Sequence, residues 1–293
     1  MERKSSMDLP GALGMTGFAT ILAFNQVVVK LVNTGIAPVF GAGLRSALAL
    51  CVLGIWCLVR GRRISGLRRS FWPGMMLGTF FGVEFLLLFV ALDLTTVARS
   101  SIVFYSMPVW LAVIAHFLLP GERLTPRRGI GLVLAMAGVA LALYQPGGGG
   151  IGWGELAALA ATLLWAGIAL IVRLTAVSTL EAESQLFWQL SVSAVILLVV
   201  APFFGPLLRD PGLWHWAGMG FQAVIVASLG FLFWLSLMRI YPASDIAAFS
   251  FLSPVLSVGM GWLILGEKLV PNVLSALVLV AVGVLLITLR RRR

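Results

Sequence analysis

The sequence predicts an all-α integral membrane protein whose ten transmembrane helices form two inverted five-helix repeats. Three observations lead to this fold class: the apolar content, the length of the apolar runs, and a pattern that occurs twice. Of the 293 residues, 60% are hydrophobic and 11% are charged, which leaves too few polar side chains to cover a soluble surface. The runs have the length of about 20 residues that crosses a hydrocarbon core as a helix, and they do not alternate as barrel strands would.

Ten apolar runs follow one another along the chain, separated by short stretches that carry charges, glycine or proline. We expect the first run to remain as a helix, because it has full length and no small-residue cleavage site follows its charged start. The expected spans are residues 11–32, 37–60, 72–92, 95–118, 127–144, 153–174, 181–204, 214–239, 243–265 and 269–290.

The second half of the chain repeats the pattern of the first half. Apolar segments resemble one another by chance, but chance does not explain repeated prolines and charged turns, and a period of roughly 145 residues is typical of duplicated halves in a membrane chain. We therefore expect an N-terminal repeat over 1–145, a glycine-rich linker over 146–152 and a C-terminal repeat over 153–293. The matching pairs are LAFNQVVVKLV at 22–32 with LWAGIALIVRL at 164–174, Pro108 with Pro254, and GERLTP at 121–126 with GEKLVP at 266–271.

The positive charges predict that the two repeats are inverted. Cytoplasmic segments of membrane proteins are enriched in Lys and Arg, and 16 of the 21 basic residues fall on one side of the expected spans. With five spans in each half, the first span runs outward, the sixth runs inward, and both termini lie in the cytoplasm. The cytoplasmic set is Arg3, Lys4, Arg60, Arg62, Arg63, Arg68, Arg69, Arg123, Arg127, Arg128, Arg173, Arg239 and Arg290 to Arg293, whereas Lys30, Arg99, Arg209 and Lys268 lie on the other side and Arg45 lies within a span.

Charge and motifs exclude several functional classes. A net charge of +10 suits a nucleic-acid-binding protein, but its position at the ends of apolar runs follows the positive-inside rule, so we expect no nucleic-acid partner. Gly147, Gly149 and Gly152 fit a G-x-G-x-x-G spacing, yet they follow an apolar helix and indicate a hinge rather than a dinucleotide site. No motif for ATP hydrolysis or proteolysis occurs, and His116 and His215 are too few for a metal site. We therefore predict no enzymatic activity, no cofactor and no metal.

Glu84 is the strongest candidate for a functional residue, because an ionised carboxylate inside a span costs about 2.5 kcal/mol or more. We expect it to face a wet cavity, to find a cation such as Arg45, or to be protonated. Glu84 and Phe80 point away from a glycine stripe on the same helix, which allows close packing of a neighbour, and they are predicted to line a substrate or proton pathway. A structural role for Glu84 is the alternative. The stripe consists of Gly74, Gly78 and Gly82.

Two aromatic residues lie in the middle of expected spans, away from the membrane borders where Trp and Tyr usually gather. Trp165 lies in the sixth span and Tyr105 lies in the fourth. Ordinary core packing explains such residues as well as a functional role does. The functional interpretation is an aromatic wall for an apolar group of the substrate, in which ring stacking contributes about 0.5–1.5 kcal/mol.

Prolines in corresponding spans predict another part of the site. Pro108 and Pro254 each remove a backbone donor and are expected to kink their helices. Carbonyl groups freed by a kink are tolerated in a bilayer where they face protein or water, so both kinks are predicted to line the midplane. Polar residues of the ninth and first spans are also predicted to line the substrate pathway. The alternative for the serines is that their hydroxyls bond to carbonyl groups of their own helix. These polar residues are Ser250, Ser253 and Ser257, together with Asn25 and Gln26.

These features resemble the EamA-type drug/metabolite transporter superfamily. The resemblance rests on the two-by-five arrangement, on the repeated proline-containing helix followed by GERLTP or GEKLVP, and on Arg45 in the second span. The WAG triplet at 165–167 is similar to bacterial inner-membrane exporters of aromatic amino acids of the YddG type. The resemblance implies a central cavity formed by spans one, three, four, six, eight and nine, with Trp165 in the binding cavity. Glu84 stands where some of those exporters have an aromatic residue, which argues against a strict aromatic preference.

The sequence therefore predicts a secondary transporter of the bacterial inner membrane that exports amino acids, with aromatic or other apolar ones favoured, and related small metabolites by alternating access. Export of other metabolites or of cationic drugs is the alternative. A membrane-embedded enzyme or lipid-handling scaffold is a weaker alternative, since the sequence offers no converging nucleophile, acid pair or metal-binding set. A channel is a further alternative, which transport measurements distinguish because a channel shows neither saturation nor counterflow of labelled substrate. The expected partners are a small-molecule substrate and the lipid bilayer, while oligomeric state is not indicated.

Overall fold

The computed structural model describes residues 8–118, 126–143, 152–241 and 252–288, and within these ranges the regular structure is helical apart from one isolated bridge between Ile36 and Leu208. The N-terminal half contains α1 (Leu9–Asn33), α2 (Pro38–Arg60), α3 (Phe71–Leu94), α4 (Val97–Phe104), α5 (Met107–Leu118) and α6 (Pro126–Leu143). The C-terminal half contains α7 (Trp153–Leu174), η1 (Ala176–Thr179), α8 (Ala182–Val200), η2 (Ala201–Phe204), α9 (Leu213–Phe221), η3 (Gln222–Gly230), α10 (Phe231–Ile240), α12 (Leu252–Leu265) and α13 (Pro271–Thr288).

Seven helical segments in the described ranges are long and apolar enough to cross a membrane, judged by length and composition, and α12 and α13 are shorter apolar helices. Large apolar side chains lie on the outside of these helices. Leu58, Phe117 and Trp214 are 84%, 79% and 86% exposed. Extensive apolar exposure of this kind is unusual for a soluble monomer and suits contact with lipid tails.

The apolar run around Pro108 is divided into two helices. α4 ends at Phe104, a two-residue turn follows, and α5 begins at Met107 with Pro108 as its second residue. Proline is accepted in the first turn of a helix, because the missing N–H would have no intrahelical acceptor there. The chain therefore breaks just before the proline and restarts with it, instead of bending within one continuous helix.

The segment between α9 and α10 is a π-helix, η3, which was not predicted from the sequence. The hydroxyl of Ser228 donates to the carbonyl oxygen of Ala223, five residues earlier, at 2.8 Å. The same hydroxyl lies 3.1 Å from the carbonyl oxygen of Ala49 in α2. The wider turn is thus held by a contact with another helix, and π-helical turns occur frequently at functional sites.

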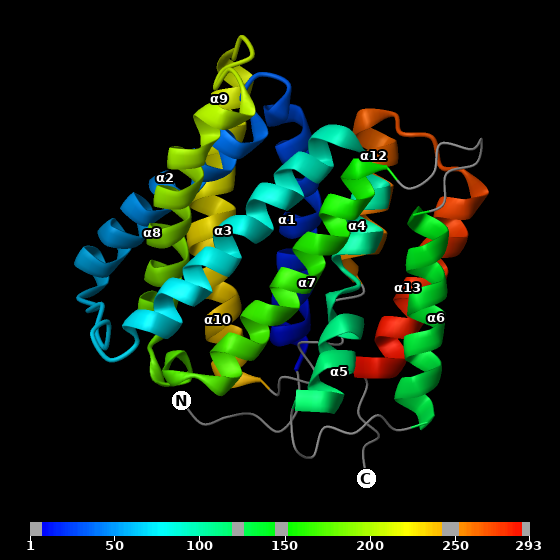
Figure 1. Cartoon of the computed structure of the whole chain (residues 1–293), viewed down its shortest axis with the longest axis horizontal. Helices are drawn as coiled ribbons and strands as arrows, with labels where there is room; N and C mark the ends of the chain where they lie inside the picture. Colours follow the sequence, from blue (N-terminus) through cyan, green and yellow to red (C-terminus); the bar gives the residue numbers. More distant parts are fainter. Residues whose placement is uncertain (1–7, 119–125, 144–151, 242–251, 289–293) are drawn as a thin grey trace.

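Helices of the two halves are interleaved and do not form two separate bundles (Figure 1). α3 packs against α7 and α8, α2 packs against α8 and η3, and α1 packs against α9 and α12. α4 contacts both α7 and α12. The buried core therefore consists mostly of contacts between the halves.

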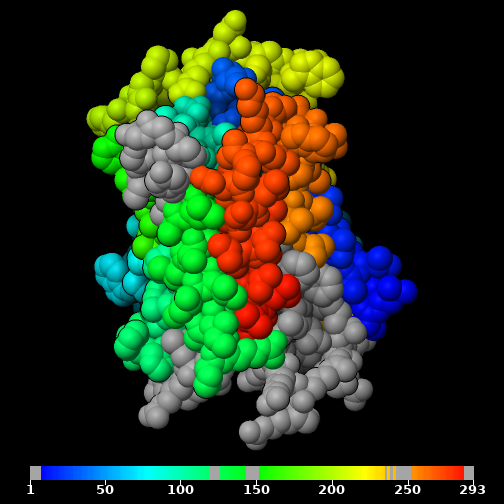
Figure 2. Space-filling view, turned by 90° about the vertical axis from the view of Figure 1, so that its right-hand side faces the viewer, coloured from blue at the N-terminus to red at the C-terminus, as the bar shows by residue number. Residues whose placement is uncertain are grey.

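α6 and α13 form a close pair at one side of the molecule, where Figure 2 shows them side by side along one face. Glycines bring the two backbones together. A Cβ atom added at Gly138 would lie 2.8 Å from the carbonyl oxygen of Ala276, and one added at Gly283 would lie 2.6 Å from that of Gly131. Close approach through small residues is the usual basis of helix association in a bilayer.

The glycine stripe of α3 forms the contact with α8. A Cβ added at Gly78 would lie 2.4 Å from the carbonyl oxygen of Trp188, and one added at Gly74 would lie 2.4 Å from the ring of the same tryptophan. At Gly82 the nearest atom is Cα of Ser193 at 3.2 Å. The absence of side chains along this stripe sets the distance between α3 and α8.

Gly78→Ala is expected to lower the melting temperature of the purified protein, because overpacking of a close contact costs about 1–3 kcal/mol. Gly17 in α1 offers a matched control, since a Cβ added there meets no atom within 4 Å. Gly17→Ala should leave the melting temperature unchanged or raise it slightly, as alanine favours a helix more than glycine does. Thermal unfolding in detergent measures both variants, and equal shifts would contradict the packing role of the stripe.

Candidate functional site

Tyr105 lies where side chains from three helices meet. It forms the turn after α4 and is 5% exposed. Its hydroxyl lies 3.4 Å from Nε2 of Gln26 in α1, and Ser253 and Ser257 of α12 also approach this hydroxyl. The break after α4 therefore joins residues of the first half to residues of the second half.

Trp165 of α7 packs against the same break. Its ring stacks on Phe104 with centroids 4.8 Å apart and an interplanar angle of 16°, and it meets Tyr105 edge-on at 6.1 Å. One turn earlier, the hydroxyl of Thr162 lies 3.1 Å from the carbonyl oxygen of Val103. A carbonyl group near the end of α4 thus faces a polar group of α7, and the aromatic group of Phe104, Tyr105 and Trp165 lies beside it.

Several buried polar atoms near Tyr105 have no hydrogen-bond partner among the residues that the structure describes. Buried polar atoms in folded proteins are normally paired, so a group of unpaired ones indicates a place for water or a ligand. An aromatic group beside such atoms suits a ligand with an apolar body and a polar head. The unpaired atoms are Oε1 of Gln26 and Oγ of Ser101, and Oδ1 of Asn25, the residue before Gln26 in α1, is also unpaired.

Glu84 of α3 and Arg45 of α2 are both buried and lie near one another, without a direct ion pair in the part of the chain that the structure describes. Glu84 is 3% exposed, Arg45 is 0% exposed, and the two side chains interact electrostatically. The guanidinium carbon of Arg45 lies 3.7 Å from the ring centroid of Phe85, while its three nitrogens have no hydrogen-bond partner within the described ranges. A cation over an aromatic ring is favourable, and a desolvated cation also favours an acidic group nearby, for which Glu84 is the candidate.

Gln222, at the start of η3, was not predicted as a site residue. It is 0% exposed, and neither atom of its amide group has a partner in the described part of the chain. One turn earlier, Gly218 packs against Val28 and Val32 of α1, so Gln222 lies about one turn deeper along the same face. A lone amide side chain within an apolar run was the signal available in the sequence.

The α3–α4 corner, residues 92–99, is held by charged side chains from other helices. The ammonium group of Lys30 donates to the carbonyl oxygens of Leu92, at 3.0 Å, and of Thr95. The carboxylate of Glu155 in α7 accepts from the hydroxyl of Thr95 at 2.7 Å and from the guanidinium group of Arg99 at 3.2 Å. α1 and α7, which belong to different halves, are therefore joined at this corner.

Glu267, in the GEKLVP turn, binds the start of α4. Its carboxylate accepts from the backbone N–H groups of Val97 at 2.7 Å and of Ala98 at 3.1 Å, where free N–H groups and the helix dipole favour a negative charge. Gly266 adopts a φ of +65° as the chain turns out of α12, a conformation that glycine accepts without strain. Val97, whose N–H Glu267 binds, lies eight residues before Tyr105, or about 12 Å along the helix at 1.5 Å per residue, so these contacts hold the end of α4 that is remote from the aromatic group.

The structure brings some of the predicted site residues together and separates others. Phe80 packs against Gly167 of α7, where an added Cβ would lie 2.7 Å from its ring. Glu84 lies near Arg45 and shares no hydrogen bond or ion pair with Tyr105 in the part of the chain described. The predicted site residues that gather near the break of α4 are Tyr105, Trp165 and Ser253, while Asn25 lies beside Gln26 in α1 with its Oδ1 unpaired in the described ranges.

Two site predictions fall wholly or partly outside the described residues, as do nearly all of the expected linker 146–152 and the start of the expected span 243–265. Ser250 lies in the segment 242–251, and so does the chain that precedes Pro254. Pro254 itself is buried in the first turn of α12. The contacts of the α3–α4 corner were not predicted, although the repeated glutamate of the GERLTP and GEKLVP turns was a signal for one of them.

Comparison with known proteins gives a family match in both halves of the chain. The sequence model of the EamA-like transporter family matches residues 9–144 and again residues 152–289. A solved crystal structure resembles the whole fold, with a TM-score of 0.68 and 22% sequence identity, covering 94% of this chain and 96% of that chain. At this identity the solved structure supports the fold alone.

Curated relatives match over most of their length. An uncharacterized transporter, YoaV of Bacillus subtilis (strain 168), is 23% identical over 283 residues, covering 94% of this chain and 96% of the relative. The aromatic amino acid exporter YddG of Ancylobacter novellus is 29% identical over 260 residues, covering 83% of this chain and 85% of the relative. Both relatives are named as transporters.

Glu84→Gln is expected to destabilise the protein strongly, because it leaves Arg45 buried without a compensating charge, a loss on the order of 3 kcal/mol. Asp93→Asn is the control. Asp93 pairs with Arg209 at 2.8 Å, but their side chains are 23% and 43% exposed, and such a pair contributes less than about 1 kcal/mol. Chemical denaturation in detergent compares the two variants, and equal losses of stability would show that Glu84 and Arg45 are not coupled.

Proposed function

Because the chain belongs to the EamA-like transporter family, we propose that it is a secondary transporter that exports amino acids, with aromatic and other apolar ones favoured, and related small metabolites. The observation that carries this proposal is the aromatic group of Phe104, Tyr105 and Trp165 beside unpaired polar atoms. The aromatic rings suit an apolar side chain, and the polar atoms suit the ammonium and carboxylate groups. The relative named as an aromatic amino acid exporter supports this substrate class.

The proposed architecture is ten transmembrane helices in two inverted repeats, over residues 1–145 and 153–293, joined by a linker over 146–152. The family model matches once in each proposed repeat. α4 with α5 serves as one span, and α9, η3 and α10 serve as another. Two copies of one fold then account for the repeated sequence pattern.

The pattern of helix contacts supports a two-fold relation between the halves, because most contacts between halves have a counterpart when every span is exchanged with its equivalent. The contact of α3 with α7 corresponds to the contact of α1 with α9 and η3. The contact of α1 with α12 corresponds to the contact of α7 with α4 and α5. α3 packs on α8 as α2 packs on η3. The remaining pairs, α2 with α8, α4 with α12 and α6 with α13, join equivalent spans directly. A two-fold axis that relates the halves produces this pattern.

The loops at the two ends of the molecule follow the same exchange. At one end, the backbone N–H of Ala37 donates to the carbonyl oxygen of Leu207 at 3.0 Å, which joins the loop after α1 to the loop before α9. At the other end, the N–H of Ser65 donates to the hydroxyl of Ser184 at 3.0 Å, which joins the loop after α2 to the start of α8. The two pairs of loops are equivalent to each other under the exchange, and they lie at opposite ends of the bundle.

The orientation follows from the basic residues. The end of the bundle that carries the loop after α2 holds Arg60, Arg62, Arg63, Arg68 and Arg69, and the positive-inside rule assigns this end to the cytoplasm. The α3–α4 corner then lies at the outer face, and both termini lie in the cytoplasm. The bacterial inner membrane is the proposed location, in keeping with the exporter relative.

Alternating access is the proposed mechanism, in which the halves move about a site that neither encloses alone. Glu267, Glu155 and Lys30 bind the α3–α4 corner, and these bonds are proposed to close the outer end. Release to the outside requires that these cross-half contacts break. These bonds are charge-assisted and partly buried, with Glu155 only 2% exposed, so opening this end requires that water reach them.

Pro108, Pro254 and the polar residues Asn25, Ser250 and Ser253 are proposed to line the pathway between the two ends. Phe80 and Glu84 are proposed to lie beside it on α3, with Glu84 balancing Arg45 when no cation or proton occupies the carboxylate. Export of other metabolites or cationic drugs is the second candidate, and the buried carboxylate of Glu84 is the observation that favours it.

Counterflow of labelled amino acids in liposomes tests the proposed function. Trp165→Ala should raise the apparent KM for tryptophan and phenylalanine by roughly two- to twelvefold, equivalent to a stacking loss of about 0.5–1.5 kcal/mol, and should change the KM for alanine less. Trp72→Ala is the control, as Trp72 is 79% exposed on the outside of the bundle. Equal effects on all substrate sizes would contradict the aromatic wall, and selective counterflow of organic cations would favour the second candidate.

The same liposomes test the role of Glu84. If Glu84→Gln transports substrate with the same dependence on a pH gradient as the parent protein, the carboxylate does not carry the coupled proton. A lost dependence with retained counterflow supports proton coupling through Glu84.

A further inference from the structure

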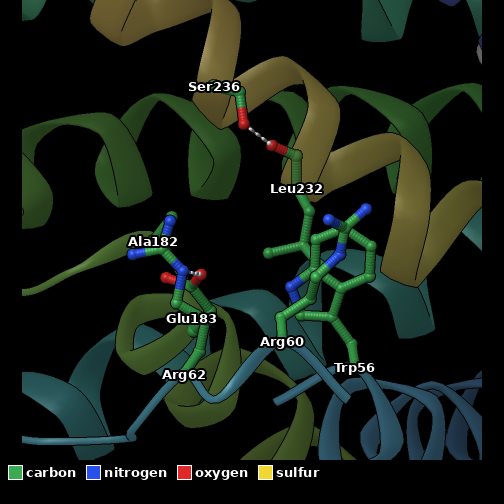
Figure 3. Close-up of a pocket in the computed structure, with 7 residues that line it drawn as sticks. All are labelled: Trp56, Arg60, Arg62, Ala182, Glu183, Leu232 and Ser236. Atoms are coloured by element: carbon green, nitrogen blue, oxygen red, sulfur yellow. Dashed lines mark hydrogen bonds and ion pairs between the residues drawn. The ribbon is translucent and has the colours of Figure 1, made fainter. Parts of the chain in front are cut away.

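A pocket of about 330 Å³ opens at the basic end of the bundle, away from the aromatic group of Tyr105. Figure 3 shows that it lies between the end of α2, the residues that follow α2, the first turn of α8, and α10. Nothing in the proposed transport pathway uses this pocket. Its lining contains two arginines, Arg60 and Arg62, and one carboxylate, that of Glu183.

The polar groups of this pocket are mostly hydrogen-bond donors. The guanidinium carbon of Arg60 lies 4.9 Å from the ring centroid of Trp56, and the buried indole N–H of Trp56 has no partner in the described ranges. Arg62 is held loosely, with its Nε 3.7 Å from a carboxylate oxygen of Glu183. A guanidinium group offers five N–H donors and one carboxylate oxygen at this distance occupies few of them, so both arginines retain donors for an anion.

The first turn of α8 adds to the positive potential. Ala182 is the first residue of this helix and lines the pocket. The side chain of the preceding residue, Glu181, does not cap the helix. The first N–H groups of a helix have no intrahelical acceptor and form its positive end. Two arginines, an indole N–H and a helix start therefore surround one cavity, with a single carboxylate opposing them.

Exposed apolar side chains lie on the same two turns of α2 as the pocket residues Trp56 and Arg60. Ile55, Leu58 and Val59 are 61%, 84% and 78% exposed on the last two turns of this helix. In a membrane chain such side chains face lipid tails, and the arginines that follow them lie at the level of the headgroups. A ligand that fits both features has an anionic head and apolar tails.

We propose that this pocket binds the phosphate headgroup of an anionic phospholipid of the cytoplasmic leaflet, with the acyl chains along Ile55, Leu58 and Val59. The headgroup phosphate accepts from Arg60, Arg62 and the indole N–H of Trp56. The pocket lies against α2, α8 and α10, which belong to both halves, so a bound lipid bridges them at the cytoplasmic end. The site is independent of which substrate is transported and rests only on the membrane placement of this end.

Titration of the purified full-length protein in neutral detergent with short-chain phosphatidylglycerol, followed by native mass spectrometry, tests this site. Phosphatidylcholine of the same chain length and inorganic phosphate form the comparison arms. We expect phosphatidylglycerol to bind more tightly than phosphatidylcholine. Arg60→Gln and Arg62→Gln should each weaken phosphatidylglycerol binding about fivefold, the usual effect of one basic residue at an anionic surface.

Two further variants make the result specific to the pocket. Glu183→Gln removes the opposing carboxylate and should strengthen phosphatidylglycerol binding, an effect opposite in sign to that of the arginine variants. Arg68→Gln changes an exposed arginine of the same loop that does not line the pocket, and it should leave binding nearly unchanged.

The outcomes decide the proposal as follows. Weaker binding in the arginine variants together with stronger binding in Glu183→Gln supports the site even if one arginine variant folds poorly. Equal binding of the two lipids, equal effects of Arg60→Gln and Arg68→Gln, or weaker binding in Glu183→Gln would overturn it. If inorganic phosphate competes fully at the concentration that phosphatidylglycerol requires, the pocket takes free phosphate and the lipid assignment is wrong.

Discussion

The close approach of helices from opposite halves is the constraint on which the rest of the structure depends. Within a bilayer, helices gain nothing from hiding apolar surface, because lipid tails are equally apolar, and association rests on tight packing through small residues. Gly78 against α8 and Gly138 and Gly283 between α6 and α13 provide that packing here. Because these contacts cross between the halves, neither half has a complete core without the other.

The same constraint places polar groups where they are otherwise too costly. Tyr105, Gln26 and Ser257 meet at the junction of α4, α1 and α12, and Arg45 lies between α2 and α3 with Glu84 as the candidate counter-charge. Unpaired polar atoms inside a membrane protein are tolerated where water or a ligand reaches them. A chain that breaks at Phe104 and widens into a π-helix at Gln222 has two points of irregular backbone beside these groups, and such irregularity is typical of transport sites between repeats.

Much of the helical pattern was predictable from the sequence, because apolar runs, charged ends and prolines are local signals. The glycine stripe of α3 was readable for the same reason. The position of the break between α4 and α5 was not predictable. A proline marks only the neighbourhood of a helix end, whereas Thr162 and Trp165, which pack against that end, are distant in sequence. The partner of a buried charge is also a tertiary property: Arg45 was one of several possibilities for Glu84. The bonds of Glu267 to α4 join residues about 170 apart; the repeated turn drew attention to this glutamate, but no local pattern identifies its partner.

Inversion of the two halves is the central claim, and the loops after the second and seventh spans test it most directly because they are equivalent in the repeat. Single cysteines are placed at Arg63 and at Asp210 in a chain without Cys51 and Cys57, and intact cells are treated with a membrane-impermeant maleimide. Inverted halves predict labelling at position 210 in intact cells and labelling at position 63 only after permeabilisation. Labelling of both positions from the same side would contradict the account.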